Sequence, residues 1–117
     1  MIEGVSAVTL STHDMARAVA FYAALGFALK YGGPTSDFTS FHAGSGYLNL
    51  FAAPVSKSWG AWGRAIFYVD DVDTQHTRAL AAGLTPEFAP RDAPWGERYF
   101  HIRDPDGHEL SFAKPLP

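Results

Sequence analysis

The 117-residue sequence contains no cysteine. Disulfides, zinc–thiolate sites and thiol nucleophiles are therefore excluded, and any chemistry must come from histidine, carboxylates, hydroxyls or a metal held by nitrogen and oxygen atoms. The sequence also has no cluster of Lys and Arg, and its nine basic residues against twelve acidic ones give a formal net charge of −3. This charge balance argues against nucleic acid as a partner.

Long hydrophobic runs are absent as well, since none approaches the roughly 20 residues that a membrane-spanning helix needs. The first ten residues carry no basic-then-apolar leader, so we expect a cytoplasmic protein without a membrane partner. What the chain does have is a hydrophobic content of 47% and an aromatic content of 15%, which is high for so short a chain. We expect a globular domain whose core uses most of these rings, while the others line a cavity or an interface.

One pattern of elements occurs twice along the chain. Hydrophobic periodicity and turn residues predict a strand at 5–10, a helix from about 15 to 25, strands at 37–42 and 47–52 around the loop 43–46, a strand at 65–69, a helix at 72–82, a strand near 85–88, the loop 89–97 and a terminal hairpin.

The ends of the two predicted helices recur at one offset. Asp14, which with Thr12 is a candidate cap of the first helix, lies 57 residues before Asp71, and Gly26 lies 57 residues before Gly83. The equal offset indicates an internal duplication. We therefore predict a single domain built from two modules, 1–53 and 64–117, joined by the linker 54–63.

Three segments carry a resemblance to a known family. They are residues 14–27, where an Asp is followed by Arg, Phe-Tyr and Leu-Gly-Phe, residues 68–73, which read Tyr-Val-Asp-Asp-Val-Asp, and residues 103–107, which read Arg-Asp-Pro-Asp-Gly. In this order and spacing the chain resembles the vicinal-oxygen-chelate superfamily, which holds glyoxalase I, bleomycin-resistance proteins and extradiol dioxygenases. The resemblance implies a homodimer and an α+β fold of two βαβββ modules, with curled mixed sheets and helices on their outer face.

Metal-using members of that superfamily hold a divalent ion inside the curled sheet with one ligand from each of four strands. Carried over to this chain, the four positions fall on Ala7, Asn49, Arg64 and Ser111. Alanine offers no ligand atom, arginine brings a permanent positive charge, and Asn and Ser are weak neutral donors, whereas such an ion prefers carboxylates or imidazoles. Glu109 is the nearest carboxylate that a shifted alignment would bring in. We predict no metal and no other cofactor.

Strand alternation predicts which side chains share the inner face of the first sheet. If residues 43–46 form the loop, His42 lies opposite Tyr47 and Ser40 lies opposite Asn49. This face then resembles an aromatic bowl with a few polar tips, which is the usual build of a small-molecule pocket. The simpler interpretation of His42 is a surface histidine at the end of a hairpin.

The terminal hairpin is expected to add a second set of side chains to the inner face. Alternation from Ser111 predicts that Glu109, Phe100 and Arg98 share its face, and that His101 lies on the helix side or at a sheet edge.

The loop 89–97 is long enough to act as a lid over the sheet. Residues 95–100, which read Trp-Gly-x-Arg-x-Phe, resemble bleomycin-resistance proteins, which also lack the metal ligands and hold flat aromatic drug rings in grooves between two subunits. Arg64 either binds an anionic ligand or forms a salt bridge with Glu109 or a surface carboxylate. The complete set of predicted ligand-binding residues is Phe38, Ser40, His42, Tyr47, Asn49, Arg64, Tyr68, Trp95, Arg98, Phe100 and Ser111.

We interpret the sequence as that of a metal-free small-molecule-binding protein that holds an aromatic or amphipathic compound, such as an antibiotic. The alternative is a lyase, isomerase or oxygenase with a displaced metal site, or with acid–base chemistry by Glu109, His42 or Tyr47. A third interpretation is an interaction module without a ligand.

Overall fold

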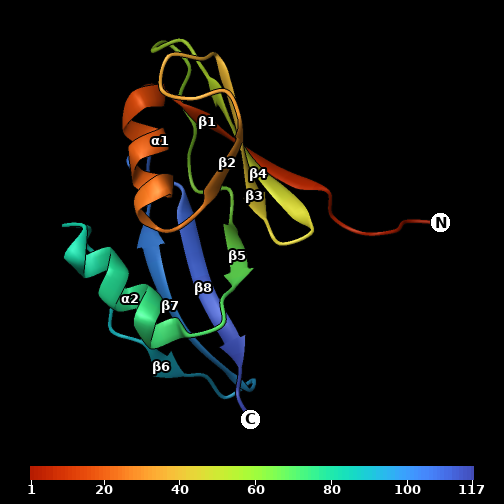
Figure 1. Ribbon diagram of the computed structural model, residues 1–117, viewed down its shortest axis with the longest axis vertical. Coiled ribbons are helices and arrows are strands. Elements are labelled where there is room, and N and C mark those ends of the chain that lie inside the picture. The colour runs from red at the N-terminus through yellow and green to blue at the C-terminus, as the bar shows by residue number, and fades with distance from the viewer. The chain divides into compact units, whose positions relative to one another are not determined.

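A computed structural model describes residues 1–117, which divide into two compact units, 1–60 and 61–117. The elements of the first unit are β1 (Ala7–Thr12), α1 (Met15–Ala24), β2 (Ala28–Tyr31), β3 (Phe38–Ala43) and β4 (Gly46–Ala52). Its strands form one sheet in the order β1-β4-β3-β2, in which β1 and β4 are parallel and the other pairs are antiparallel. Figure 1 shows α1 lying along one face of this sheet.

The second unit repeats this architecture. Its elements are β5 (Arg64–Tyr68), α2 (Val72–Ala81), β6 (Arg91–Asp92), β7 (Glu97–Arg103) and β8 (Glu109–Pro115). The sheet order is β5-β8-β7-β6, again with a parallel first pair, and α2 packs on β7 and β8 (Figure 1). The predicted α+β class, with two βαβββ modules and mixed sheets, is confirmed. The finer division into modules 1–53 and 64–117 within one domain stays a prediction.

The helix ends follow from local hydrogen bonding. The side chains of Asp14 and Asp71 each accept a hydrogen bond from the backbone N–H three residues later, so both cap their helices. Gly26 and Gly83 have φ values of 94° and 78°, a left-handed conformation that favours glycine and ends a helix. Neither ten-residue helix has the length and apolar character that crossing a membrane would require.

Each sheet has one face covered by the helix of its own unit and a second face that the helix leaves free, which we call the open face. On the covered face of the first sheet, Phe41, Leu48 and Leu50 are fully buried. Their strand neighbours alternate to the open face. The buried residues of α1 are Met15, Ala18, Val19, Phe21 and Tyr22.

Helix α2 buries one narrow stripe of side chains. It buries Val72, Gln75 and Ala79, which lie on one stripe of the helix, whereas Leu80 is 54% exposed. His76 lies at the edge of this stripe, with its ring 5.1 Å from that of Phe100.

The predicted strand at 85–88 is wrong, because the short strand before β7 is β6 at Arg91–Asp92. Pro86 has no N–H to donate to a ladder, and the backbone joins β7 near here only through the bond from the Glu87 N–H to the His101 carbonyl. The sequence pattern also gave no position for β2 in the first unit.

The register of the terminal hairpin corrects the predicted faces of Arg98 and Phe100. Arg103 pairs with Glu109, so the turn holds five residues, 104–108, whereas the predicted faces correspond to a turn of four residues, 104–107. One extra residue in the turn moves every side chain of β7 to the opposite face relative to β8. His101 therefore pairs with Ser111 on the open face, and Phe100 pairs with Phe112 on the covered face.

Candidate functional site

The open face of the first sheet carries the predicted side chains together. The strand register confirms that His42 lies opposite Tyr47 and Ser40 opposite Asn49. Phe38, two residues before Ser40, shares this face and is 40% exposed. All five residues expected on this face from the first module are therefore on one surface.

Rings dominate this surface. The ring of Tyr31 lies 6.5 Å from that of Phe38, and the ring of His42 lies 5.9 Å from that of Tyr47. The ammonium of Lys30 lies 4.3 Å from the centre of the Tyr47 ring, a cation–π contact. The open face of the first sheet thus offers several aromatic rings, one of which lies beside the cation of Lys30.

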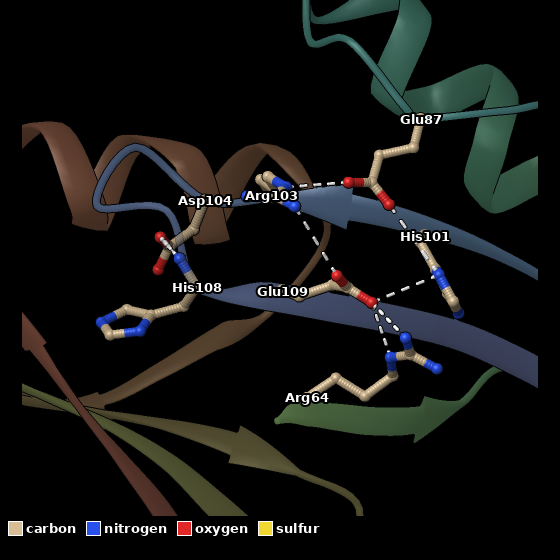
Figure 2. Close-up of polar contacts among 7 residues, drawn as sticks. All are labelled: Arg64, Glu87, His101, Arg103, Asp104, His108 and Glu109. Atoms are coloured by element: carbon tan, nitrogen blue, oxygen red, sulfur yellow. Dashed lines mark hydrogen bonds and ion pairs between the residues drawn. The ribbon is translucent and has the colours of Figure 1, made fainter. Parts of the chain in front are cut away.

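The open face of the second sheet has a charged half, drawn in Figure 2. Register places Arg64 of β5 beside Glu109 of β8, and Nε and Nη2 of Arg64 both lie 2.6 Å from Oε1 of Glu109. The alternative of a salt bridge from Arg64 to Glu109 is therefore confirmed. Arg103 binds Glu87 through Nε at 2.8 Å, and its Nη2 lies 4.0 Å from Oε2 of Glu109.

His101 lies between these two carboxylates, where the sequence did not place it. Its Nδ1 is 3.4 Å from Oε1 of Glu109 and 3.8 Å from Oε2 of Glu87, and its side chain is only 13% exposed (Figure 2). Burial is the main cause that lowers the pKa of His101, and the positive charge of Arg64 adds to it, while Glu109 and Glu87 oppose the shift. A neutral imidazole in this position donates from one nitrogen and accepts at the other.

The four residues that the family resemblance assigns to metal-ligand positions do not fit a divalent ion. Ala7 offers no ligand atom, and the amide nitrogen of Asn49 donates to a threonine hydroxyl at 3.2 Å. The guanidinium of Arg64 is bonded to Glu109, and Ser111 contributes a single hydroxyl. No carboxylate or imidazole stands among the four, so the donor set lacks what such an ion binds.

A different group of possible ligands was missed by the sequence reasoning. Glu87, His101 and Glu109 each offer one ligand atom, and these three atoms lie within 4.8 Å of one another. Both carboxylates already have arginine partners, so a divalent ion would have to compete with the guanidinium groups of Arg64 and Arg103. Only a correct hairpin register could have revealed this group, because the predicted register turned His101 away from Glu109.

The other half of this open face is aromatic and surrounds one carboxylate. The indole Nε1 of Trp95 donates to Oε1 of Glu97 at 2.9 Å, and the hydroxyl of Tyr68 donates to Oε2 of the same carboxylate. The hydrogen bond to Glu97 is the main cause that raises the pKa of Tyr68. The ring of Tyr99 lies 5.4 Å from that of Trp95. Trp95 and Tyr68 are each 65% exposed.

Two predicted ligand-binding residues lie away from the open faces. Phe100 is fully buried on the covered face, where it contacts Phe112, because of the one-residue shift in the hairpin. Arg98 is turned to the same side, and its guanidinium binds Asp73 of α2 and Asp92 of β6. Both residues therefore support the structure of the second unit.

The predicted residues of the second module that do share its open face are Arg64, Tyr68 and Ser111. Trp95 precedes β7 and contacts this face through Glu97 and Tyr99. Glu97 and Tyr99 were missed, although their alternation with Phe100 would have indicated them once the hairpin register was known.

Comparison with known proteins relates the chain to a known family. The model of the Glyoxalase/Bleomycin resistance protein/Dioxygenase superfamily matches residues 4–112. Uncharacterized proteins of Mycobacterium tuberculosis and Mycobacterium bovis are 46% identical over 48 residues, which is 41% of this chain. The match spans only 28% and 32%, respectively, of those longer relatives.

Solved structures with the same fold cover nearly the whole chain. TioX from Micromonospora sp. ML1 is 28% identical, covers 97% of this chain and 99% of its own, and has a TM-score of 0.78. Lactoylglutathione lyase from Agrobacterium tumefaciens is 26% identical, with coverage of 96% and 93% and a TM-score of 0.77. A bleomycin-binding protein complexed with bleomycin is 22% identical, with coverage of 97% and 98% and a TM-score of 0.75.

Proposed function

This chain belongs to the Glyoxalase/Bleomycin resistance protein/Dioxygenase superfamily, and we propose that it is a metal-free small-molecule-binding protein. In this proposal the open faces of its sheets hold an aromatic or amphipathic compound, such as an antibiotic. The proposal places the protein in the cytoplasm as a homodimer.

The observation that carries the proposal is the set of exposed and half-buried rings on the open faces. Phe38 and Tyr47 lie on the first sheet, and Tyr68, Trp95 and Tyr99 lie on or beside the second. Each stacked aromatic pair contributes roughly 0.5–1.5 kcal/mol beyond the buried area, so a few such contacts support useful affinity. Polar groups between the rings give a ligand orientation.

The donor set supports the metal-free part of the proposal. The family's four ligand positions carry Ala7, Asn49, Arg64 and Ser111, which together form a poor site for a divalent ion. The bleomycin-binding protein complexed with bleomycin is an example of this fold holding a drug. At 22% identity that likeness supports the fold alone, and the support for an aromatic ligand comes from the rings of this chain itself.

A specific observation also favours an enzyme as the second candidate. Lactoylglutathione lyase from Agrobacterium tumefaciens is 26% identical over almost the whole chain. The second unit brings Glu109, His101 and Glu87 together, which is a possible acid–base or metal-binding group. In this alternative Glu109 is the catalytic candidate, because the structure places its carboxylate beside His101. His42 lies exposed beside Tyr47, and neither has a carboxylate partner.

Thermal unfolding separates the two candidates when the protein is purified without chelator and divided into two series. One series receives glycopeptide and flat aromatic antibiotics, and the other receives Ni²⁺, Mn²⁺, Zn²⁺ or Fe²⁺. We expect an aromatic compound at about 100 times its Kd to stabilise the protein by about 2.7 kcal/mol, which raises Tm by roughly 10 °C. We expect elemental analysis to find no stoichiometric metal and the ions to give no comparable rise.

Two variants show whether the compound binds at the open face of the first sheet. Tyr47→Ala removes a ring from this face and is expected to weaken binding by about 1 kcal/mol. Leu80→Ala removes an exposed side chain of similar apolar character from α2 and is expected to leave the affinity unchanged. A stoichiometric metal with a larger rise in Tm than any compound gives would contradict the proposal and favour the enzyme.

A further inference from the structure

Glu97 differs from the other carboxylates near the open face of the second sheet. Glu109 and Glu87 have arginine partners at 2.6 and 2.8 Å. The two oxygens of Glu97 instead accept hydrogen bonds from the indole of Trp95 and the hydroxyl of Tyr68, and both donors are neutral. Its carboxylate is therefore oriented by two hydrogen bonds while its negative charge has no cationic partner.

The basic residue next to it along β7 cannot supply that partner. Arg98 is turned to the covered face, where its guanidinium lies 2.8 Å from Asp73 and 3.0 Å from Asp92. Arg91 lies with its guanidinium 3.6 Å from the centre of the Phe88 ring and 5.8 Å from that of Tyr99. Arg91 thus contacts the rings of Phe88 and Tyr99 and makes no ion pair with Glu97.

The rings around Glu97 are suited to a positive charge. Trp95 and Tyr68 donate to opposite oxygens of the carboxylate, so an indole and a phenol stand beside it, and Tyr99 packs 5.4 Å from the indole. The faces of such rings carry negative potential and attract ammonium groups. Both Trp95 and Tyr68 are mostly exposed, so a ligand can reach them.

We propose that Tyr68, Trp95, Glu97 and Tyr99 form a subsite for the cationic group, a protonated amine or a quaternary ammonium, of an aromatic or amphipathic ligand. This inference rests on the proposed function, because it names the chemical class of the compound that the open face binds. We call this group the Glu97 subsite.

Charge complementarity argues for a cation over a neutral or anionic ligand. A neutral ring stacked on Trp95 and Tyr99 would remove water from the Glu97 carboxylate without forming a compensating interaction with it. Desolvating an uncompensated charge is costly in free energy. An anion would in addition be repelled by Glu97. A cation replaces the lost water by an ion pair and by contacts with ring faces. The raised pKa of Tyr68 is consistent with a hydroxyl that keeps its proton and continues to donate to Glu97.

The test compares two flat probes of nearly the same size and shape. At neutral pH 9-aminoacridine is a cation and acridine is uncharged, and isothermal titration calorimetry at low salt measures both affinities. We expect the cation to bind the wild-type protein about tenfold more tightly than the neutral ring, which is the combined size of an exposed ion pair and a cation–π contact. This comparison needs no variant.

Glu97→Gln keeps an oxygen that accepts from Trp95 or Tyr68 and removes only the charge. It is expected to weaken 9-aminoacridine binding about tenfold and to leave acridine binding within about twofold. Asp70→Asn removes one negative charge two residues after Tyr68, outside the subsite, and is the matched control that should change neither affinity by more than about twofold. Trp95→Ala should weaken both probes, since it removes a ring that each one stacks on.

The outcomes distinguish failure of the Glu97 subsite from failure of the proposed function. Equal binding of both probes, or an unchanged preference for the cation in Glu97→Gln, would overturn the Glu97 subsite and leave the proposed function standing. A lack of binding by both probes would contradict the proposed function for flat aromatic ligands, and the subsite with it. A cation preference that disappears in Glu97→Gln and persists in Asp70→Asn supports the subsite.

Discussion

At the scale of single residues, the charge of Arg64 affects two neighbours on the second sheet, Glu109 and His101. Its guanidinium binds Glu109 and also lowers the pKa of His101, in addition to the effect of burial. Because the pKa of folded His101 lies below its ordinary value of 6.5, the unfolded chain takes up a proton first as the pH falls. The contribution of neutral His101 to stability is therefore present above pH 6.5 and is lost as the pH falls through the pKa of the folded protein.

Arg64→Gln should raise the pKa of His101, and Glu109→Gln should lower it further. The reason is that the variants remove charges of opposite sign close to the imidazole. The C2–H proton resonance of His101, assigned with the help of His101→Gln, follows the titration by NMR. Arg64→Gln should accordingly reduce the loss of stability on acidification that is due to His101.

Lys114→Gln is the control for this pair of variants. Lys114 lies on the same sheet, but it pairs with Arg98 on the covered face and is not among the groups that shift His101. Its replacement should leave the pKa of His101 unchanged. Shifts of the same sign in Arg64→Gln and Glu109→Gln would contradict the arrangement of this charged cluster.

At the scale of elements, the β7–β8 hairpin depends on one buried carboxylate. Asp104 is 5% exposed, and its Oδ1 accepts hydrogen bonds at 2.9 Å from the backbone N–H groups of Asp106 and His108. His108 is itself 4% exposed, and its Nδ1 accepts from the indole of Trp62 at 2.7 Å. Gly107 closes the turn with a φ of 86°.

Asp104→Ala should destabilise the protein by about 1–3 kcal/mol, because it leaves two backbone donors of a buried turn without their acceptor. Asp104→Asn retains an oxygen that accepts both bonds, so its cost should be clearly smaller. Urea unfolding of the three proteins measures the free energies of unfolding. Equal stability of Asp104→Ala and wild type would show that the carboxylate does not hold the hairpin.

At the scale of the whole molecule, each unit covers one sheet face with its own helix and leaves rings exposed on the other. On the second sheet Ile66 and Tyr68 are 59% and 65% exposed, and exposed apolar surface of this kind is typical of interaction sites. The same faces are the proposed sites for ligands. Pairing of two chains over these faces would cover the exposed rings of both copies. A homodimer would therefore bury the exposed rings and also contribute to ligand binding.

Light scattering after size-exclusion chromatography should give the mass of two chains, and Tm should rise with protein concentration. Ile66→Asp places a charge on the open face and should shift the protein towards the monomer. Val55→Asp makes the same change at a residue that is 84% exposed outside the strands, and it should leave the dimer intact. A single-chain mass at every concentration would contradict the homodimer.

Local patterns in the sequence were sufficient to predict much of this fold. Asp14 and Asp71 cap helices, and Gly26 and Gly83 end them, because capping and positive φ depend on the residue itself and its nearest neighbours. The predicted loop 43–46 gave the correct register, although Ala43 and Gly46 pair at the ends of β3 and β4, so the ring-lined face of the first sheet followed from alternation alone. The family resemblance rested on such local segments and was confirmed over residues 4–112.

Only the tertiary structure decided the site on the second sheet. The turn at 104–108 holds one residue more than the predicted turn, and that difference moved His101 to Glu109 and buried Phe100. The sheet order β5-β8-β7 brings Tyr68 to Glu97, 29 residues later in the chain. Alternation along a strand says which residues share a face only after the register is known, and register and strand order are set by packing between segments far apart in sequence.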